Sequence, residues 1–238
     1  MMRLNKYLAL CGLGSRRKSE VFIQAGSVAV NGNVVQSLSQ VIDETKDVVT
    51  VKGQPIQPPD KFVYLLLNKP KGYVTSAHDE LGRKTVMHLI PGDHRVFSVG
   101  RLDKDTKGAL LLTNDGALAF RLMHPRFQVD KIYHVTLNMP ITIKHIQKLM
   151  SGIMLDDGIT HKCDVKVIGQ DHRNIEMTLH EGRKRQVRRM LQALGYQVTD
   201  LVRTQFASLT IKDLKPGEWR FLTNPEIAQL KSLAPGKT

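Results

Sequence analysis

The chain has 238 residues, enough for one large domain or for a small domain followed by a larger one. Its 35 lysine and arginine residues outnumber its 22 aspartate and glutamate residues, which gives a formal net charge of +13 and favours a polyanionic partner such as nucleic acid. No apolar run approaches the roughly 20 residues of a membrane span, and the N-terminus has no signal-peptide pattern. Cys11 and Cys163 lie far apart, outside any zinc or disulfide pattern. We therefore expect a cytoplasmic protein.

Two short helices are predicted at the start of the chain. The first has one apolar face, on which the following residues recur at helical spacing: Leu4, Tyr7, Leu8 and Cys11. Ser15 is placed to cap the second helix and Gly26 to end it. In this second helix we expect Val21, Phe22 and Ala25 to pack inward. Its outer face carries a group that we call the N-terminal basic cluster, formed by Arg16, Arg17 and Lys18.

A β-hairpin is predicted at residues 28–35, because the dipeptide Asn31-Gly32 tolerates the positive φ angles of a tight turn. Together with the two helices, this hairpin makes residues 1–52 a small helix-hairpin domain. The following stretch, 53–61, contains three prolines, which disfavour helix and sheet and predict an extended connector.

A second, larger domain is expected at residues 62–238. Short apolar runs of strand length are interrupted there by helices predicted at about 117–123, 141–150 and 185–194. A last helix is expected to begin at Asn224-Pro225. This irregular alternation indicates an α+β fold with a mixed sheet rather than repeated βαβ units.

Asp103 is the first candidate for chemistry. It lies in a polar, glycine-punctuated loop between a strand predicted at 96–99 and an apolar run at 109–112. Catalytic groups often occupy such loops, because the flanking elements hold them rigidly. An isolated loop aspartate more often caps a turn, however, so Asp103 by itself is only suggestive.

Several motifs, in order along the chain, resemble those of the RsuA/RluB branch of bacterial ribosomal RNA pseudouridine synthases. The central motif is GRLDKDTKGALLLTNDG, preceded by YLLLNKPKGYVTS and followed by KIYHVTL and EGRKRQVRRM. The opening RLNKYLALCGLGSRRKSEVFIQAGSVAVNG resembles an S4 RNA-binding domain. The resemblance implies an S4-like domain followed by a mixed-sheet pseudouridine synthase domain. It also implies an enzyme that isomerises one flipped-out uridine of ribosomal RNA without a cofactor or metal.

Three residues are catalytic by this resemblance: Asp103, Tyr133 and Arg188. Asp103 supplies a carboxylate that attacks the sugar, attacks the uracil ring or removes a ribose proton, and the sequence leaves these roles open. Tyr133 offers a stacking face and a hydroxyl for proton transfer, although a strand tyrosine without this motif is usually a core residue. Arg188 flanks the apolar stripe of its helix, where we expect it to pair with Asp103 and keep it ionised and oriented.

RNA contacts are expected from a wider set of basic residues. Arg101 is expected to fill the base stack or to hold phosphate, and the lysines of the NKPKG turn and the arginines of the last motif are expected to contact phosphate. The plain alternative for each is a solvated surface charge. The full set is Arg16, Arg17, Lys18, Lys69, Lys71, Arg101, Arg183, Arg185 and Arg189.

The resemblance implies, as the target, a uridine of 23S rRNA near the peptidyl-transferase region, in free RNA or in a pre-ribosomal particle. Arg185 stands where many relatives have a histidine, which is typical of RluB-like enzymes and weakens the case for a catalytic histidine. Two alternatives stay open. One is an RsuA-like enzyme acting on 16S rRNA, and the other is a noncatalytic rRNA-binding or ribosome-assembly protein. Nothing in the sequence demands more than a monomer.

Overall fold

A computed structural model describes residues 1–77, 79–90, 92 and 95–233, so residues 234–238 of the expected large domain lie outside the described part. The chain divides into two compact units, Met1–Phe62 and Val63–Thr238, which we call the N-terminal unit and the large unit. Among the described residues, no helix is long and apolar enough to cross a membrane.

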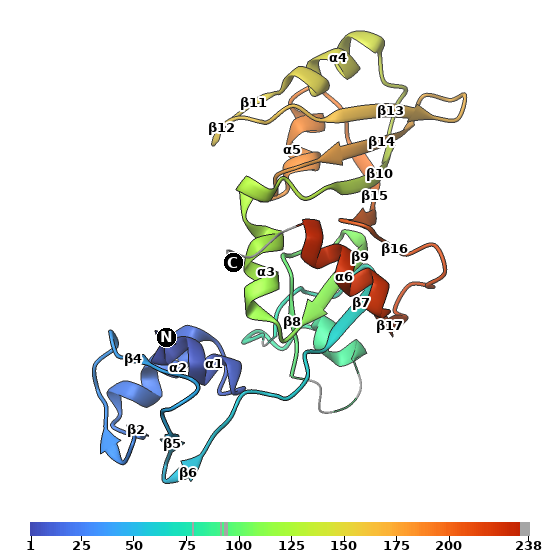
Figure 1. The fold of residues 1–238 in the computed structure, drawn as a ribbon. Helices are drawn as coiled ribbons and strands as arrows, with labels where there is room; N and C mark the ends of the chain where they lie inside the picture. The colour runs from blue at the N-terminus through green and yellow to red at the C-terminus, as the bar shows by residue number, and fades with distance from the viewer. Residues whose placement is uncertain (78, 91, 93–94, 234–238) are drawn as a thin grey trace. The chain divides into compact units, whose positions relative to one another are not determined.

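The N-terminal unit packs two helices with short strands around one apolar core (Figure 1). Strands β3-β2-β5-β6 form one sheet, and β1 pairs with β4. The core is centred on Leu4 and Leu8 of α1 and Ile23 of α2, all fully buried. Its elements are β1 (Met2–Arg3), α1 (Leu4–Leu10), α2 (Arg16–Gln24), β2 (Val28–Val30), β3 (Asn33–Val34), β4 (Val41–Ile42), β5 (Val49–Val51) and β6 (Gln54–Pro55).

The predicted caps and turn of this unit are confirmed. The Ser15 hydroxyl accepts a hydrogen bond from the Lys18 amide at 3.2 Å, and Gly26 follows the end of α2 with a φ of +67°. Asn31 and Gly32 have φ angles of +51° and +82°, as the hairpin turn requires.

The prediction for the inward face of α2 is wrong for Val21 and Ala25, which are exposed. Ser19 and Ile23, one turn apart, are fully buried instead. Ser19 can be buried because its hydroxyl donates to the Ser15 carbonyl at 3.1 Å, so no polar group is left unpaired.

The connector also begins later than predicted. Gln54 and Pro55 form β6, which pairs with Val51 and Thr50 of β5. Proline is tolerated at this position because β6 is the last strand of its sheet, where one side needs no backbone donor.

The large unit is built on one mixed sheet of nine strands in the order β13-β14-β10-β15-β9-β7-β17, with β16 beside β15 and β8 beside β9. The β15–β9 pair is parallel, and the other strand pairs of this sheet are antiparallel. The strands are β7 (Tyr64–Lys69), β8 (Phe97–Ser98), β9 (Lys107–Thr113), β10 (Lys131–Leu137), β13 (Asp164–Ile168), β14 (Asn174–Leu179), β15 (Val198–Phe206), β16 (Leu209–Thr210) and β17 (Trp219–Phe221). The predicted α+β class is confirmed.

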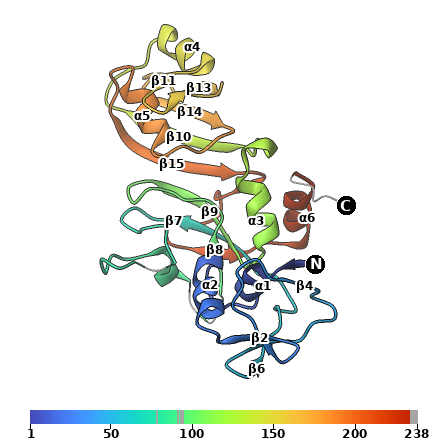
Figure 2. The same ribbon diagram turned by 90° about the vertical axis from the view of Figure 1, so that its left-hand side faces the viewer.

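Helices cover this sheet in two groups. Helices α3 and α6 lie side by side in both ribbon views and share an apolar cluster that includes Leu118, Leu122 and Leu230 (Figures 1 and 2). Helices α4 and α5 pack over the β13–β14–β10 end through Leu149 and Met190. The predicted helices are confirmed to within two residues at each end. The remaining elements are η1 (Val86–Leu89), α3 (Gly116–Met123), η2 (Pro125–Phe127), α4 (Ile143–Ser151), the hairpin strands β11 (Met154–Leu155) and β12 (Gly158–Ile159), α5 (Gln186–Gln192) and α6 (Asn224–Leu233).

Candidate active site

Asp103 lies half-buried in the loop that connects β8 to β9. Thr75, itself buried, holds this loop on both sides of Leu102: its hydroxyl donates to the Leu102 carbonyl at 2.7 Å, and it accepts from the Leu102 amide at 3.2 Å. The Thr106 amide donates to the Asp103 carbonyl at 3.0 Å, which closes a turn around the carboxylate. The backbone that carries Asp103 is therefore fixed before any substrate binds. Thr75 was not predicted, although it lies in the YVTS part of the first motif.

Lys69, at the end of β7, binds the backbone of the same loop. Its side chain is fully buried, and its ammonium group donates to the carbonyl oxygens of Asp103, Lys104 and Thr106 at 2.9–3.3 Å, and to its neighbour Pro70 at 3.1 Å. Burial lowers the pKa of Lys69 to about 8, against the opposing effect of the nearby aspartates. The predicted phosphate contact of Lys69 is therefore wrong, because the ammonium is enclosed and donates to carbonyl oxygens of the Asp103 loop.

Tyr133 is half-buried on β10, opposite Met177 of β14 and Arg203 of β15. Its ring packs against two apolar clusters, one under α4 and α5 and one that contains Leu102 of the Asp103 loop. The structure therefore brings Tyr133 and the Asp103 loop to one region of the large unit.

Arg188 reaches the same loop from α5. Its guanidinium donates to the carbonyls of Val198 at 3.0 Å and Asp105 at 3.3 Å. In the described part of the chain no ion pair joins Arg188 to Asp103, so the expected direct pairing is wrong for this structure. Each terminal nitrogen directs one N–H to a main-chain carbonyl, so the contact of Arg188 with the Asp103 loop is with the backbone. This contact is made at Asp105, which follows Asp103 by two residues in the chain.

The parallel junction of β9 and β15 lies directly after this loop. Gly108 pairs with Arg203, and a Cβ at Gly108 would lie 2.1 Å from the Arg203 carbonyl oxygen.

Arg203 is only 2% exposed. Its Nε donates to the Ala109 carbonyl at 2.8 Å, and its guanidinium lies 5.0 Å from the Phe206 ring centroid. Burial is the main reason that the pKa of Lys131 falls to about 8, and the positive charge of Arg203 is the second. Arg203 was missed, although an arginine inside the apolar strand pattern DLVRTQF was a signal for it.

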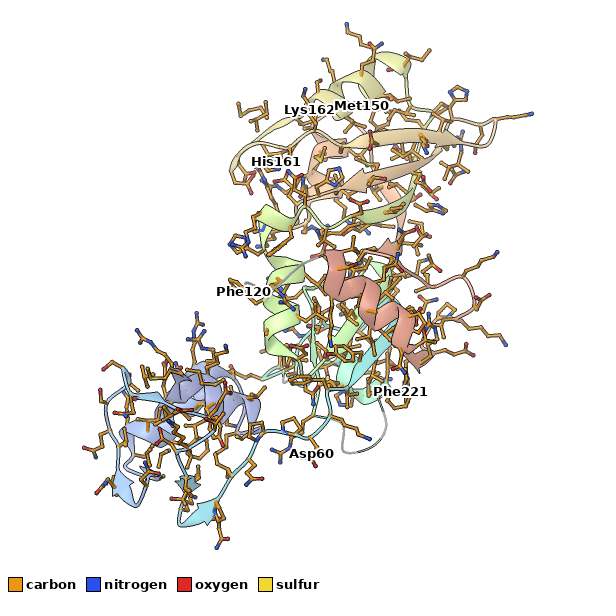
Figure 3. All side chains as sticks on the ribbon, in the orientation of Figure 1. Asp60, Phe120, Met150, His161, Lys162 and Phe221 are labelled. Carbon is orange, nitrogen blue, oxygen red and sulfur yellow. The ribbon has the colours of Figure 1, made fainter. Side chains whose placement is uncertain are left out.

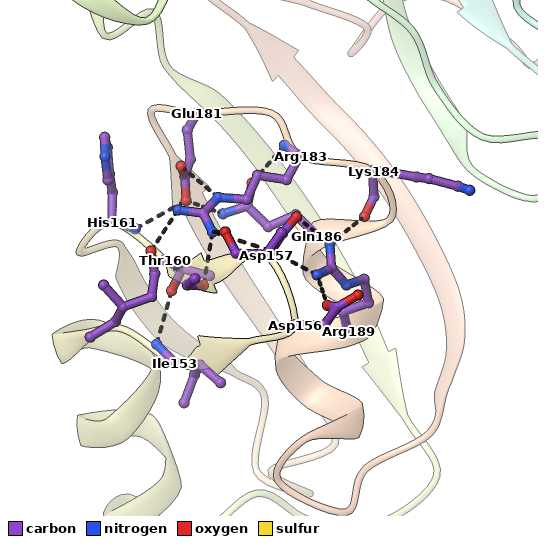
Figure 4. A network of polar contacts seen from close by, with 12 residues as sticks. Ile153, Asp156, Asp157, Thr160, His161, Glu181, Arg183, Lys184, Gln186 and Arg189 are labelled. Carbon is purple, nitrogen blue, oxygen red and sulfur yellow. Dashed lines mark hydrogen bonds and ion pairs between the residues drawn. The ribbon is translucent and has the colours of Figure 1, made fainter.

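The arginines of the last motif form an intramolecular network with the β11–β12 hairpin (Figure 4). Arg183 pairs with Glu181 and donates to the Gly158 and Ile159 carbonyls. Arg189 pairs with Asp156 and Asp157. Hydrogen bonds from Arg189 are the main reason that the pKa of Asp157 falls to about 2. The predicted phosphate contacts of Arg183 and Arg189 are therefore corrected: their donors hold a hairpin.

The other predicted RNA-binding residues are available at the surface. Arg101 and Lys71 are exposed near the Asp103 loop, and Arg185 is exposed just before α5 with a φ of +51°. The N-terminal basic cluster is exposed in the first turn of α2. Their contacts with RNA stay predictions.

Comparison with known sequences bears on this arrangement. Residues 63–193 match the family model described as RNA pseudouridylate synthase, and residues 2–49 match that of the S4 domain. The chain belongs to the RNA pseudouridylate synthase family. The family resemblance drawn from the motifs is thereby confirmed, and so is the S4 domain at the N-terminus.

The similarity of this synthase to its relatives extends over the whole chain. It is 40% identical to the ribosomal large subunit pseudouridine synthase B of Bacillus subtilis, covering 98% of this chain and 97% of the relative. It is 37% identical to the dual-specificity RNA pseudouridine synthase RluF of Salmonella typhi, covering 99% and 81%. A crystal structure of a pseudouridylate synthase aligns with a TM-score of 0.71 at 32% identity, covering 97% of this chain and 100% of that one.

Proposed function

We propose that this synthase converts one uridine of 23S rRNA to pseudouridine, with Asp103 as the central carboxylate and Tyr133 and Arg188 beside it. One observation carries the proposal: the Asp103 loop is clamped by Lys69 and Thr75, receives the guanidinium of Arg188, and shares an apolar cluster with Tyr133. The large-subunit target is supported by the name of the Bacillus subtilis relative and by Arg185 in the last motif. We further propose that the enzyme acts as a monomer in the cytoplasm.

The reaction exchanges one bond for another within a single nucleoside. The N1–C1′ glycosidic bond breaks, the uracil rotates, and C5 bonds to C1′, while C5 loses a proton and N1 gains one. A rigidly held carboxylate is suited to the covalent or proton-transfer step, because a fixed loop spends no free energy on reorganisation during the reaction. The Tyr133 ring supplies a surface for a flipped base, whose unstacking costs a few kcal/mol.

Replacement of Asp103 by asparagine tests the proposed role of its carboxylate. We expect Asp103→Asn to bind rRNA like the unaltered protein but to form pseudouridine about 10²-fold more slowly or not at all, because the amide is a poor nucleophile and base. The matched control is Asp105→Asn in the same loop, since Arg188 contacts the Asp105 carbonyl and not its side chain. Equal turnover of Asp103→Asn and the unaltered enzyme would exclude Asp103 as the central carboxylate.

Mapping of pseudouridines in purified 23S and 16S rRNA after incubation with the enzyme distinguishes the proposed 23S activity from a 16S activity and from a noncatalytic role. A single new site in 23S rRNA is the expected result. A site in 16S rRNA only would assign an RsuA-like specificity. RNA binding without modification of either RNA, in free form or in ribosomal particles, would indicate a noncatalytic role.

A further inference from the structure

A group of rings, one exposed and two half-buried, lies on α3 and the turn after it. Phe120 is 60% exposed and Met123 is 48% exposed, although both are large apolar side chains. Figure 3 shows Phe120 projecting outward from α3. Contiguous exposed apolar surface of this kind often marks a binding site. We call this group the α3 ring patch; its members are Phe120, Met123, His124, Arg126 and Phe127.

The rings of this patch are ordered by contacts with one another. Phe120 and His124, one helical turn apart, have centroids 5.5 Å apart at an interplanar angle of 60°. His124 and Phe127 have centroids 6.4 Å apart at 82°, and the Arg126 guanidinium lies 4.4 Å from the Phe127 centroid. His124 Nδ1 also accepts a hydrogen bond from the Arg126 amide at 3.2 Å, which fixes the turn. The patch is therefore preorganised.

The α3 ring patch is continuous with the Asp103 loop. The Gly100 amide donates to the Met123 sulfur at 3.0 Å, so one end of the loop lies directly on the patch. The exposed Arg101 follows Gly100, and Asp103 lies two residues further on. The patch therefore adjoins the N-terminal end of the loop that carries Asp103.

The chemistry of the patch fits nucleobases. Aromatic rings, imidazole and guanidinium planes are the groups on which unpaired RNA bases stack, and such stacking accepts every base because each has a π-face. No member of the patch carries a negative charge that would repel phosphate. A flipped uridine leaves its neighbours partly unstacked, and an adjacent platform offsets that cost.

We propose that the α3 ring patch is a stacking platform for an unpaired base next to the target uridine. The proposal rests on the proposed function in so far as RNA is the substrate. It adds a binding site outside the catalytic residues, with Phe120 as the central ring.

The test replaces Phe120 in the full-length protein and uses two probes of equal backbone charge: a nine-nucleotide oligoadenylate and an abasic oligomer of the same length. Phe120→Ala and Phe120→Leu are expected to bind the oligoadenylate roughly 5- to 150-fold more weakly, which corresponds to ~1–3 kcal/mol for one stacked base. Phe120→Trp is expected to retain affinity within about twofold, and its new indole fluorescence should be quenched by the oligoadenylate but not by the abasic oligomer. The control is Phe221→Ala on β17, an exposed ring of similar accessibility that should leave binding unchanged (Figure 3).

Three results would overturn the platform. Phe120→Leu could bind the oligoadenylate as tightly as the unaltered protein, Phe120→Ala could weaken both probes equally, or Phe120→Ala could change sedimentation without changing RNA affinity, which would mark a protein interface. Failure of the proposed function gives a different pattern. In that case no rRNA is modified by the unaltered enzyme, while the differences among the Phe120 variants on the oligoadenylate persist.

Discussion

Lys69 carries the clearest electrostatic consequence at the scale of one residue. Its pKa falls from 10.5 in the unfolded chain to about 8 in the folded protein, because burial penalises the charged form. Between these values the unfolded state binds more protons, so stability contributed by this site rises with pH from about 8 to 10.5. We predict that the free energy of unfolding of the unaltered protein increases relative to that of Lys69→Met over this window. Urea unfolding followed by the fluorescence of Trp219, the single tryptophan, measures it.

The control for this prediction is Lys71→Met, an exposed lysine of the same turn. It should follow the unaltered protein across the whole pH range. A constant difference between Lys69→Met and the unaltered protein from pH 8 to 10.5 would show that the lysine does not lose its proton in the folded state.

Residue-scale expectations failed where distant segments decide the environment. The NKPKG motif indicates a turn next to the site, and β7 does end at Lys69. The motif does not reveal that residues 103–106 fold over the ammonium with three carbonyl oxygens. Likewise, the choice between Val21 and Ile23 as the buried residue of α2 depends on the helix and strands packed against it, because both positions are apolar.

At the scale of elements, the parallel contact between β9 and β15 begins directly after the Asp103 loop. Gly108 has a φ of +112°, and an added Cβ would collide with the Arg203 backbone. We predict that Gly108→Ala destabilises the large unit by about 3 kcal/mol, from strain and overpacking combined. Thermal unfolding followed by circular dichroism measures the loss. Gly182→Ala is the control, because a Cβ there meets nothing within 4 Å and should cost no more than about 0.5 kcal/mol. Equal melting temperatures of Gly108→Ala and Gly182→Ala would contradict the close approach of Gly108 to the Arg203 backbone.

Ion pairs join the turn of the β11–β12 hairpin to the arginines of the last motif. Asp157 joins both Arg183 and Arg189, so its neutralisation removes the shared partner. We predict that Asp157→Asn increases amide hydrogen exchange of the hairpin, residues 154–159, while exchange of the buried strand β9 stays unchanged. Mass spectrometry of exchanged peptides checks this, with Asp164→Asn on the nearby strand β13 as the control. Unaltered hairpin exchange in Asp157→Asn would mean that backbone contacts alone hold it.

Periodicity and capping signals predicted the elements well, because they are local. The strand at β10, the cap at Ser15 and the helices α3 to α6 all follow from patterns within about ten residues of sequence. The pairing of Arg183 and Arg189 with the β11–β12 hairpin did not follow, since Asp156 and Asp157 precede these arginines by more than twenty residues. A charge run therefore predicted RNA contact where the fold uses the charge internally.

At the scale of the whole molecule, family motifs located the Asp103 loop, Tyr133 and Arg188, but not the contacts between them. Arg188 was expected at the Asp103 carboxylate and instead reaches the Asp105 carbonyl. Such contacts depend on how β9, β15 and α5 pack together, which no single motif encodes. The N-terminal unit carries an exposed basic cluster and the large unit carries the Asp103 loop, so the proposed RNA-binding and catalytic residues lie in different units.

This separation leads to a prediction for the N-terminal basic cluster. All three side chains are exposed on α2, so their replacement by alanine should leave the fold intact. Each of these side chains is expected to neutralise one phosphate. The triple variant Arg16→Ala, Arg17→Ala, Lys18→Ala should therefore have a weaker salt dependence, with a slope of log affinity against log salt that is less negative by about 2 to 3. Titration of rRNA fragments at several salt concentrations measures that slope. A matched control removes three exposed lysines elsewhere in the same unit, at Lys46, Lys52 and Lys61. Equal loss of slope in both variants would indicate a diffuse electrostatic effect, whereas an unchanged slope in the first would assign RNA gripping to another surface.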